Sequence, residues 1–135
     1  MTQLIANTDG ACRGNPGASA IGVILKTPTG QVVKSVCRAV GNMTNNQAEY
    51  HAVIAALEEA LKLGATELAL NADSELVVKQ LNGQYRVKNP GLEPLYARVK
   101  GLETKFKSVK YRSIPRERNR DADALANQAF KDPKA

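Results

Sequence analysis

Apolar residues in the first third of this chain follow the alternation expected of β-strands. Residues 3–9 form a short apolar-rich run, and residues 18–27 hold Ile21, Val23 and Leu25 on alternate positions. A period of two is typical of a strand with one buried face. Residues 28–30 carry a proline and a glycine, which signal a turn, and residues 32–40 resume a β-branched run. The pattern predicts three strands, the last two joined as a hairpin.

The middle of the chain changes to helical spacing. Thr44 or Asn45 can cap a helix that runs to about Leu63, and Gly64 is a typical stop signal after it. Further along, apolar runs and turn signals alternate. They predict a strand over 66–72, a short helix capped by Ser74, a helix from about Leu92 to Phe106, a strand over 109–114, a charged loop over 115–120 and a final helix over 121–131.

The predicted order is β-β-β-α-β-α-α-β-α. Hairpins at the start imply antiparallel pairing, whereas the later β-α-β crossovers imply parallel pairing. We therefore expect an α/β fold with a mixed five-stranded sheet and helices packed on it. Residues 1–131 are of a length that forms one domain, and we expect 132–135 to be a short frayed tail.

Composition restricts the partners and the compartment. The formal net charge of +6 and the pI near 9.5 favour a polyanionic partner. No run of about 18 or more apolar residues or secretory signal is visible, so we expect a cytoplasmic protein with no membrane association. Cys12 and Cys37 lack the CxxC spacing of redox motifs. Reduced thiols are the simpler interpretation, and a disulfide between them stays open.

Four acidic residues fall where predicted elements begin or end. Asp9 ends the first strand and opens a glycine-rich turn, Glu49 lies in the predicted first turn of a helix, Asp73 follows a strand, and Asp123 begins the last helix. Mg²⁺ takes oxygen ligands, so together the four carboxylates suggest a site for divalent cations. Each acid alone also fits ordinary turn or helix-capping chemistry, and glycines punctuate loops in many proteins.

Four motifs surround these acids: TDGACRGNPG at Thr8–Gly17, TNNQAE at Thr44–Glu49, ADS at Ala72–Ser74 and NRDADALA at Asn119–Ala126. In this order and spacing, the chain resembles the type 1 ribonuclease H family over nearly its whole length. The resemblance implies the ribonuclease H fold, with a sheet ordered 3-2-1-4-5 and helices on both faces. It also implies a metal-dependent endonuclease that cuts the RNA strand of RNA–DNA hybrids, leaving 5′-phosphate and 3′-hydroxyl ends.

The resemblance assigns roles to individual residues. Asp9, Glu49, Asp73 and Asp123 would hold two Mg²⁺ ions, with Mn²⁺ as the alternative. Substrate contacts would come from Gly10, Ala11, Cys12, Arg13, Asn15, Asn45 and Glu75. Glu75 stands where the family often has glutamine, and a carboxylate lacks the amide donors.

The chain departs from the best-known bacterial branch of the family in two places. The loop before the last acid has no histidine, and Arg116 is the candidate substitute, with Arg118 as the fallback; a merely solvated basic loop is the other interpretation. His51 is given no catalytic role. The segment 82–92 is too short for the basic protrusion of some relatives. We therefore expect weaker, less processive substrate binding than in those relatives.

Two alternative functions stay open at this point. The chain could be a non-catalytic module that binds hybrids, although a pure binder has no need of four acids. It could also cleave double-stranded RNA, because both duplexes present 2′-hydroxyls and A-like geometry. A monomer is expected in each case.

Overall fold

A computed structural model describes residues 2–131, so the tail expected at 132–135 lies outside the described residues. The elements follow the predicted order, with one added 3₁₀ turn. They are β1 (Gln3–Gly14), β2 (Gly17–Lys26), β3 (Val32–Met43), α1 (Asn45–Lys62), β4 (Glu67–Ala72), α2 (Glu75–Leu81), α3 (Glu93–Glu103), β5 (Ser108–Ser113), the 3₁₀ turn (Arg116–Arg118) and α4 (Arg120–Gln128).

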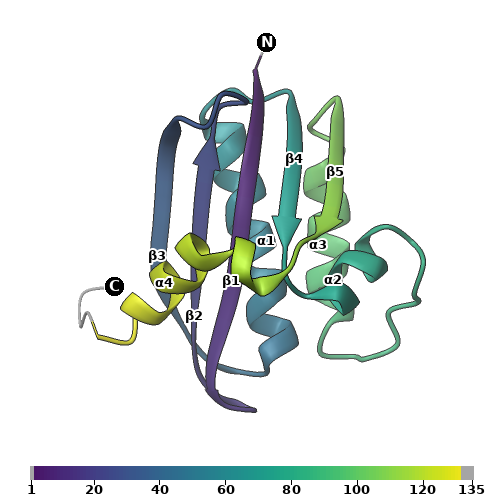
Figure 1. Ribbon diagram of the computed structural model, residues 1–135. Helices are drawn as coiled ribbons and strands as arrows, with labels where there is room; N and C mark the ends of the chain where they lie inside the picture. Colours follow the sequence, from purple (N-terminus) through teal and green to yellow (C-terminus); the bar gives the residue numbers. More distant parts are fainter. Residues whose placement is uncertain (1, 132–135) are drawn as a thin grey trace.

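The five strands form one sheet in the order β3-β2-β1-β4-β5, which confirms the expected topology. β1 and β2 pair antiparallel, as do β2 and β3, whereas β4 runs parallel to both β1 and β5. In Figure 1, α1 and α3 lie behind the sheet and α4 crosses in front of it. Helices therefore pack on both faces of the sheet, with β1 at its centre, but α4 crosses over β1, β2 and β3 and leaves part of the front face open.

The core lies between α1 and the sheet. Apolar residues recur along α1 at helical spacing, and small alanines between them let the helix approach the strands. Tyr50 is fully buried, and its hydroxyl donates to Gln80 Oε1 of α2 over 2.7 Å. This bond satisfies a polar group that would otherwise be costly to bury. None of the described helices has the length and apolarity needed to cross a membrane.

The glycine-rich segment after Asp9 is not the loop that the sequence suggested. Gly10 to Gly14 continue β1 and pair with Gly17 to Ile21 of β2, so only Asn15 and Pro16 lie between the two strands. A ladder partner for each backbone residue outweighs the weak strand preference of glycine. The segment is thus a paired hairpin arm, which projects beyond the end of β4.

Three helices also differ in detail from the prediction. Thr44 caps α1 in a reciprocal capping box with Gln47, so the first turn ends before Glu49, which lies in the second turn. α3 ends at Glu103, which places Phe106 beyond the helix. α4 begins one residue early, at Arg120, and ends at Gln128. Helix ends depend on capping contacts that periodicity alone does not reveal.

Candidate functional site

Three of the four predicted acids meet where the parallel strands β1 and β4 part. The last paired residues of these strands are Thr8 and Ala72, and Asp9 and Asp73 follow them directly in the sequence. Glu49 arrives from α1. One carboxylate oxygen from each of the three lies within 4.8 Å of the others. Asp9 and Glu49 are buried, and Asp73 is partly exposed.

Gly10 brings Glu49 to this point. A Cβ on Gly10 would lie 2.5 Å from the backbone carbon of Ala48 and 2.5 Å from the nitrogen of Glu49, so α1 presses directly on the strand. The Gly10 N–H donates to Glu49 Oε1 over 3.0 Å. That donor is available because β4 has already ended on this side of β1. The lack of a side chain here therefore serves the approach of a helix, as well as any ligand.

Asp123 reaches Asp9 from the opposite face of the sheet. Gly22 pairs with Asp9 across β1 and β2, and a Cβ on Gly22 would lie 2.1 Å from the carbonyl oxygen of Ala122 in α4. Close packing here sets Asp123 beside Asp9, and the proximity of the Asp123 carboxyl contributes to the raised pKa of Asp9. Asp123 stands outside the group of three within 4.8 Å.

Asn119 is a component of the site that sequence reasoning did not single out. Its Nδ2 donates to the carbonyl of Thr8 over 2.8 Å and to Asp73 Oδ2 over 3.2 Å. The residue is 1% exposed. It sits immediately before α4, inside the NRDADALA motif, so its place in that motif was the available signal.

Burial and mutual repulsion raise the pKa values of the two buried acids. Loss of water raises the pKa of Asp9 to about 9, with further contributions from the charges of Glu49 and Asp73. Burial also raises the pKa of Glu49 to about 7, although the Gly10 N–H bond opposes the rise. Carboxylates this close together resist simultaneous ionisation unless a cation neutralises them.

The donor set fits hard divalent cations. It consists of carboxylate oxygens, which Mg²⁺ and Mn²⁺ prefer. Glu49 Oε2 is buried without a hydrogen-bond partner among the described residues, and such an atom needs a ligand to offset its desolvation. The hollow beside the acids has a volume of about 300 Å³. It is lined by Asp9, Gly10, Asn45, Asn46, Glu49, Asp73, Ser74 and Arg116.

The two candidate arginines of the 3₁₀ turn face different surroundings. Arg116 lines the acidic hollow, and its Nη2 lies 3.8 Å from Asp123 Oδ1. Its charge also opposes the rise in the pKa of Glu49. Arg118 instead lines a separate hollow on the open face of the sheet. His51 lies outside the residues that line the acidic hollow.

The predicted substrate contacts divide into three groups. Gly10 and Asn45 line the hollow, and Asn15 Oδ1 accepts the Asn45 N–H over 3.1 Å at the start of α1. Ala11, Cys12 and Arg13 lie on the projecting arm of β1, with the Arg13 guanidinium 4.4 Å from the centre of the Phe130 ring.

Cys12 of the second group also contacts β3, and Glu75 alone makes up the third group. The Cys12 thiol donates to the carbonyl of Met43 over 3.2 Å, and both Cys12 and Cys37 are free thiols. Glu75 is exposed at the start of α2 and forms a 2.7 Å ion pair with Lys79.

Known proteins are similar to this chain in both sequence and geometry. The family model described as reverse transcriptase-like matches residues 7–129. The chain is 43% identical over 129 residues to the bifunctional protein Rv2228c of Mycobacterium tuberculosis, a match that covers 95% of this chain and 35% of that protein. It is 44% identical over 124 residues to a ribonuclease HI of Halobacterium salinarum, covering 92% of this chain and 62% of that protein.

Solved structures agree with these matches. The RNase H1 of Halobacterium salinarum superposes with a TM-score of 0.93 at 43% identity, covering 96% of this chain and 98% of that one. LC11-RNase H1, solved in complex with an RNA/DNA hybrid, gives a TM-score of 0.91 at 37% identity, covering 95% and 96%. The chain therefore belongs to the reverse transcriptase-like proteins of the ribonuclease H family.

Proposed function

We propose that this chain is a ribonuclease H, which hydrolyses the RNA strand of RNA–DNA hybrids to 5′-phosphate and 3′-hydroxyl ends. The observation that carries this proposal is the convergence of Asp9, Glu49 and Asp73 within 4.8 Å, with Asp123 beside them. Family membership supports it, as does the similarity to LC11-RNase H1, which was solved with such a hybrid.

The four carboxylates would hold two Mg²⁺ or Mn²⁺ ions. Bound divalent ions of this kind activate a water and stabilise the leaving oxygen of a phosphodiester. The chain itself supplies the framework: the Gly10 N–H orients Glu49, and the Asn119 amide orients Asp73. With its low exposure and its two donated hydrogen bonds, this framework is set before substrate arrives, which lowers the cost of ordering it.

Arg116 is our candidate for the position that holds a histidine in the best-known bacterial relatives. Its side chain is 80% exposed, so it can move toward a phosphate above the acids. An arginine stays protonated and is a poor general base, so its role would be to neutralise phosphate charge. Proton transfer would then depend on water rather than on this side chain.

The hybrid would lie across Gly10, Ala11, Cys12, Arg13, Asn15, Asn45 and Glu75. Recognition of 2′-hydroxyls suits backbone groups and amide side chains, which Gly10, Asn15 and Asn45 provide beside the acids. Glu75 is held by Lys79 and offers acceptors alone, so its contact would be the weakest of this set. The expected monomer and cytoplasmic location stay predictions, as does the division into domain and tail.

A cleavage assay tests the proposal and its alternatives together. Matched RNA–DNA, RNA–RNA and DNA–DNA duplexes are incubated with Mg²⁺, Mn²⁺ or chelator, and the products are resolved on a gel. We expect the protein to cleave the RNA strand of the hybrid when Mg²⁺ or Mn²⁺ is present and to leave it intact in chelator. Binding without any turnover would instead indicate a hybrid-binding module, and comparable cleavage of RNA–RNA would indicate the broader enzyme.

The sharpest variant is Asp73→Asn, which keeps the shape and the Asn119 contact but removes the charge. We expect hybrid cleavage to fall by more than the roughly 10–100-fold that follows loss of a group outside the ligand set, with the thermal midpoint nearly unchanged. Asp121→Asn is the matched control, because Asp121 is exposed on the same helix as Asp123 and does not line the hollow. Full activity of Asp73→Asn with Mg²⁺ would overturn the proposed function.

A further inference from the structure

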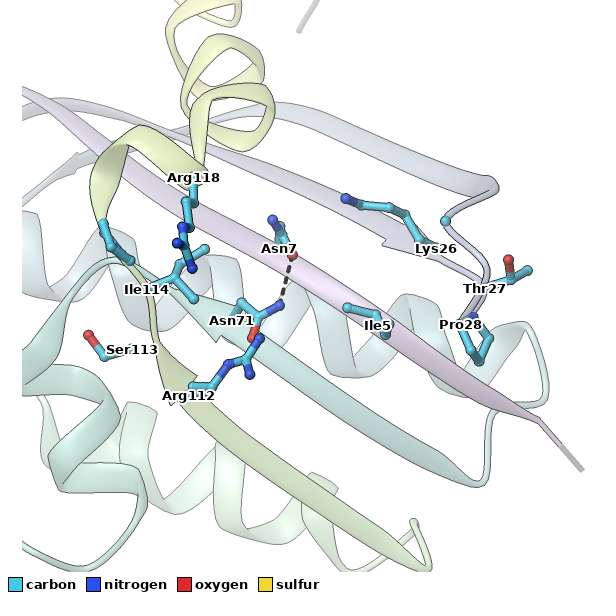
Figure 2. Close-up of a pocket in the computed structure, with 12 residues that line it drawn as sticks. Ile5, Asn7, Lys26, Thr27, Pro28, Asn71, Arg112, Ser113, Ile114 and Arg118 are labelled. Atoms are coloured by element: carbon cyan, nitrogen blue, oxygen red, sulfur yellow. Dashed lines mark hydrogen bonds between the residues drawn. The ribbon is translucent and has the colours of Figure 1, made fainter.

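A second hollow lies on the open face of the sheet, across the 3₁₀ turn from the acids. Figure 2 shows its lining: Asn7 of β1 and Asn71 of β4 form the floor, Arg112 of β5 and Arg118 stand at one side, and Lys26 at the other. We name it the open-face hollow. Its volume is about 400 Å³. The acid cluster shares none of its lining residues.

The charge of the open-face hollow is uniformly positive. Lys26, Arg112 and Arg118 line it, and the described residues that form its wall include no carboxylate. None of these three cations takes part in the ion pairs found among residues 2–131. Cations that lack an internal partner and converge on one hollow favour an anionic ligand.

The floor of the open-face hollow carries two side-chain amides that can form hydrogen bonds with a nucleotide. Asn7 and Asn71 are register partners on β1 and β4, and Asn71 Nδ2 donates to Asn7 Oδ1 over 3.2 Å. That bond fixes both side chains and turns the Asn7 amide nitrogen away from Asn71, as Figure 2 shows. Amide donors and acceptors of this kind recognise base edges and 2′-hydroxyls.

Position links the hollow to the acids. Asn7 and Asp9 are two residues apart on β1, so their side chains share a face and lie about 7 Å apart along the strand. The turn Arg116–Arg118 separates the two hollows and contributes Arg116 to one and Arg118 to the other. A strand that crosses this turn from the acids would reach the open-face hollow directly.

We infer that the open-face hollow binds an unpaired nucleotide of the RNA strand where that strand continues beyond the acids. Lys26, Arg112 and Arg118 contact its phosphate, and the paired asparagines contact its base or ribose. A hollow of about 400 Å³ suits a ligand of nucleotide size and is too small for a duplex. The inference rests on the proposed function and deepens it, by naming hybrids with a single-stranded RNA extension as a preferred substrate.

The test compares the affinity of blunt and extended hybrids by fluorescence anisotropy, in the Asp73→Asn background with Mg²⁺ so that the strand stays intact. The extension is a short single strand of RNA at either end of the RNA strand. We expect one of the two extended hybrids to bind about threefold to tenfold more tightly than the blunt one. Its salt dependence should be steeper, since each added phosphate contact on a single strand changes the log–log slope by about −0.7.

Variants locate the effect. Arg112→Gln with Arg118→Gln should bring the ratio of extended to blunt affinity close to one. The control pair, Arg38→Gln with Arg120→Gln, removes the same charge from exposed residues outside the hollow and should keep the ratio. A ratio near one for the parent, or a ratio that survives the Arg112 and Arg118 changes, would overturn the inference.

A third arm identifies the strand. If an extension of the DNA strand alone tightens binding, the occupant is DNA and our assignment to RNA is wrong. Cleavage of the blunt hybrid by the unaltered protein reports the proposed function separately. Cleavage with a ratio near one would refute the open-face hollow alone, whereas tighter binding of the extended hybrid by a protein that never cleaves would refute the nuclease alone.

Discussion

At the scale of single residues, the buried Asn119 ties the start of α4 to both strands that carry acids. One amide nitrogen holds the Thr8 carbonyl of β1 and the Asp73 carboxylate after β4. Its Oδ1 is buried without a partner among the described residues, as is the nearby hydroxyl of Thr8. Asn119 is thus buried with one of its polar atoms unpaired, while its amide nitrogen holds Asp73. This arrangement points to a role in positioning the Asp73 carboxylate.

We predict that Asn119→Ala destabilises the protein and weakens metal binding. Leaving the Thr8 carbonyl unpaired in the interior should lower the free energy of unfolding by roughly 1–3 kcal/mol. Urea denaturation measures this loss, and calorimetric titration with Mg²⁺ measures the second effect. Asn42→Ala, at an exposed position of β3, is the control and should change neither quantity. Unaltered Mg²⁺ affinity in Asn119→Ala would show that the residue is structural alone.

We also predict that Arg116→Gln slows cleavage more than it weakens binding. The exposed guanidinium lies near the acids, so its charge matters most when a phosphate is present. Loss of one such charge should reduce kcat about 100-fold, the lower end of the loss that follows removal of one group that stabilises developing charge. Steady-state kinetics on a blunt hybrid would measure it. Arg120→Gln, two residues past Arg118, provides the matched control; an equal fall in both variants would assign the effect to net charge.

At this scale, the sequence predicted the candidate metal ligands more successfully than the residues that position them. Asp9, Glu49 and Asp73 could be chosen because four motifs occur in a family order, and the structure brings these three together. Asn119 and Gly22 were not singled out, because their roles depend on contacts with residues about 100 positions away. A lone glycine inside a strand does signal a close approach of another backbone, but it does not say of which one.

At the scale of elements, two helices meet the central hairpin from opposite faces at neighbouring positions. α1 presses on Gly10 and delivers Glu49, while α4 presses on Gly22 and delivers Asp123. Alternation along β1 sends Asp9 to the α4 face, yet Glu49 still reaches it because β4 has ended beside Gly10. The early end of β4 is thus what lets both faces contribute to one site.

We predict that Gly22→Ala displaces α4. The new methyl carbon would lie 2.1 Å from a carbonyl oxygen and 2.7 Å from a backbone nitrogen of that helix, and neither atom can move alone. Overpacking of this kind costs roughly 1–3 kcal/mol, so the denaturation midpoint and hybrid cleavage should both fall.

Gly101→Ala is the contrasting change, because the new methyl carbon meets no other atom within 4 Å. It lies inside α3 and should raise stability by up to about 1 kcal/mol. A Gly22→Ala protein as stable and active as the parent would mean that α4 does not depend on this close contact.

The prediction of elements succeeded where a hydrophobic pattern extended over many residues. It failed where hydrogen bonding to a neighbouring strand determined the structure. Helical spacing located α1 and its cap, alternation located β2, and a β-branched run located β3. Local sequence predicts a loop for the arm of β1 beyond Asp9, because glycine and proline signal turns. Its strand character comes from the ladder to β2, which a local pattern does not contain.

At the scale of the whole molecule, the acid cluster ties stability to pH. The pKa of Asp9 rises from 3.8 to about 9 on folding, and that of Glu49 from 4.5 to about 7. Between these limits the folded protein binds more protons than the unfolded chain. The free energy of unfolding contributed by these groups is therefore greatest below pH 4 and declines as the pH rises toward 9.

We predict that in chelator the thermal midpoint falls between about pH 5 and pH 9 by more in the parent than in Asp9→Asn. Added Mg²⁺ should raise the midpoint of the parent more at the higher pH, since metal competes with protons for the same oxygens. Differential scanning calorimetry in matched buffers measures both. A pH profile that Asp9→Asn leaves unchanged would contradict the raised pKa of Asp9.

The placement of the four acids also has a consequence for the order in which the molecule is made. Synthesis proceeds from the N-terminus, so Asp9 emerges from the ribosome early, while Asp123 emerges only with α4. Until that helix docks on Gly22, a growing chain holds an incomplete set of acids. The proposed metal site would therefore gain its fourth carboxylate only after α4 has been made and has docked.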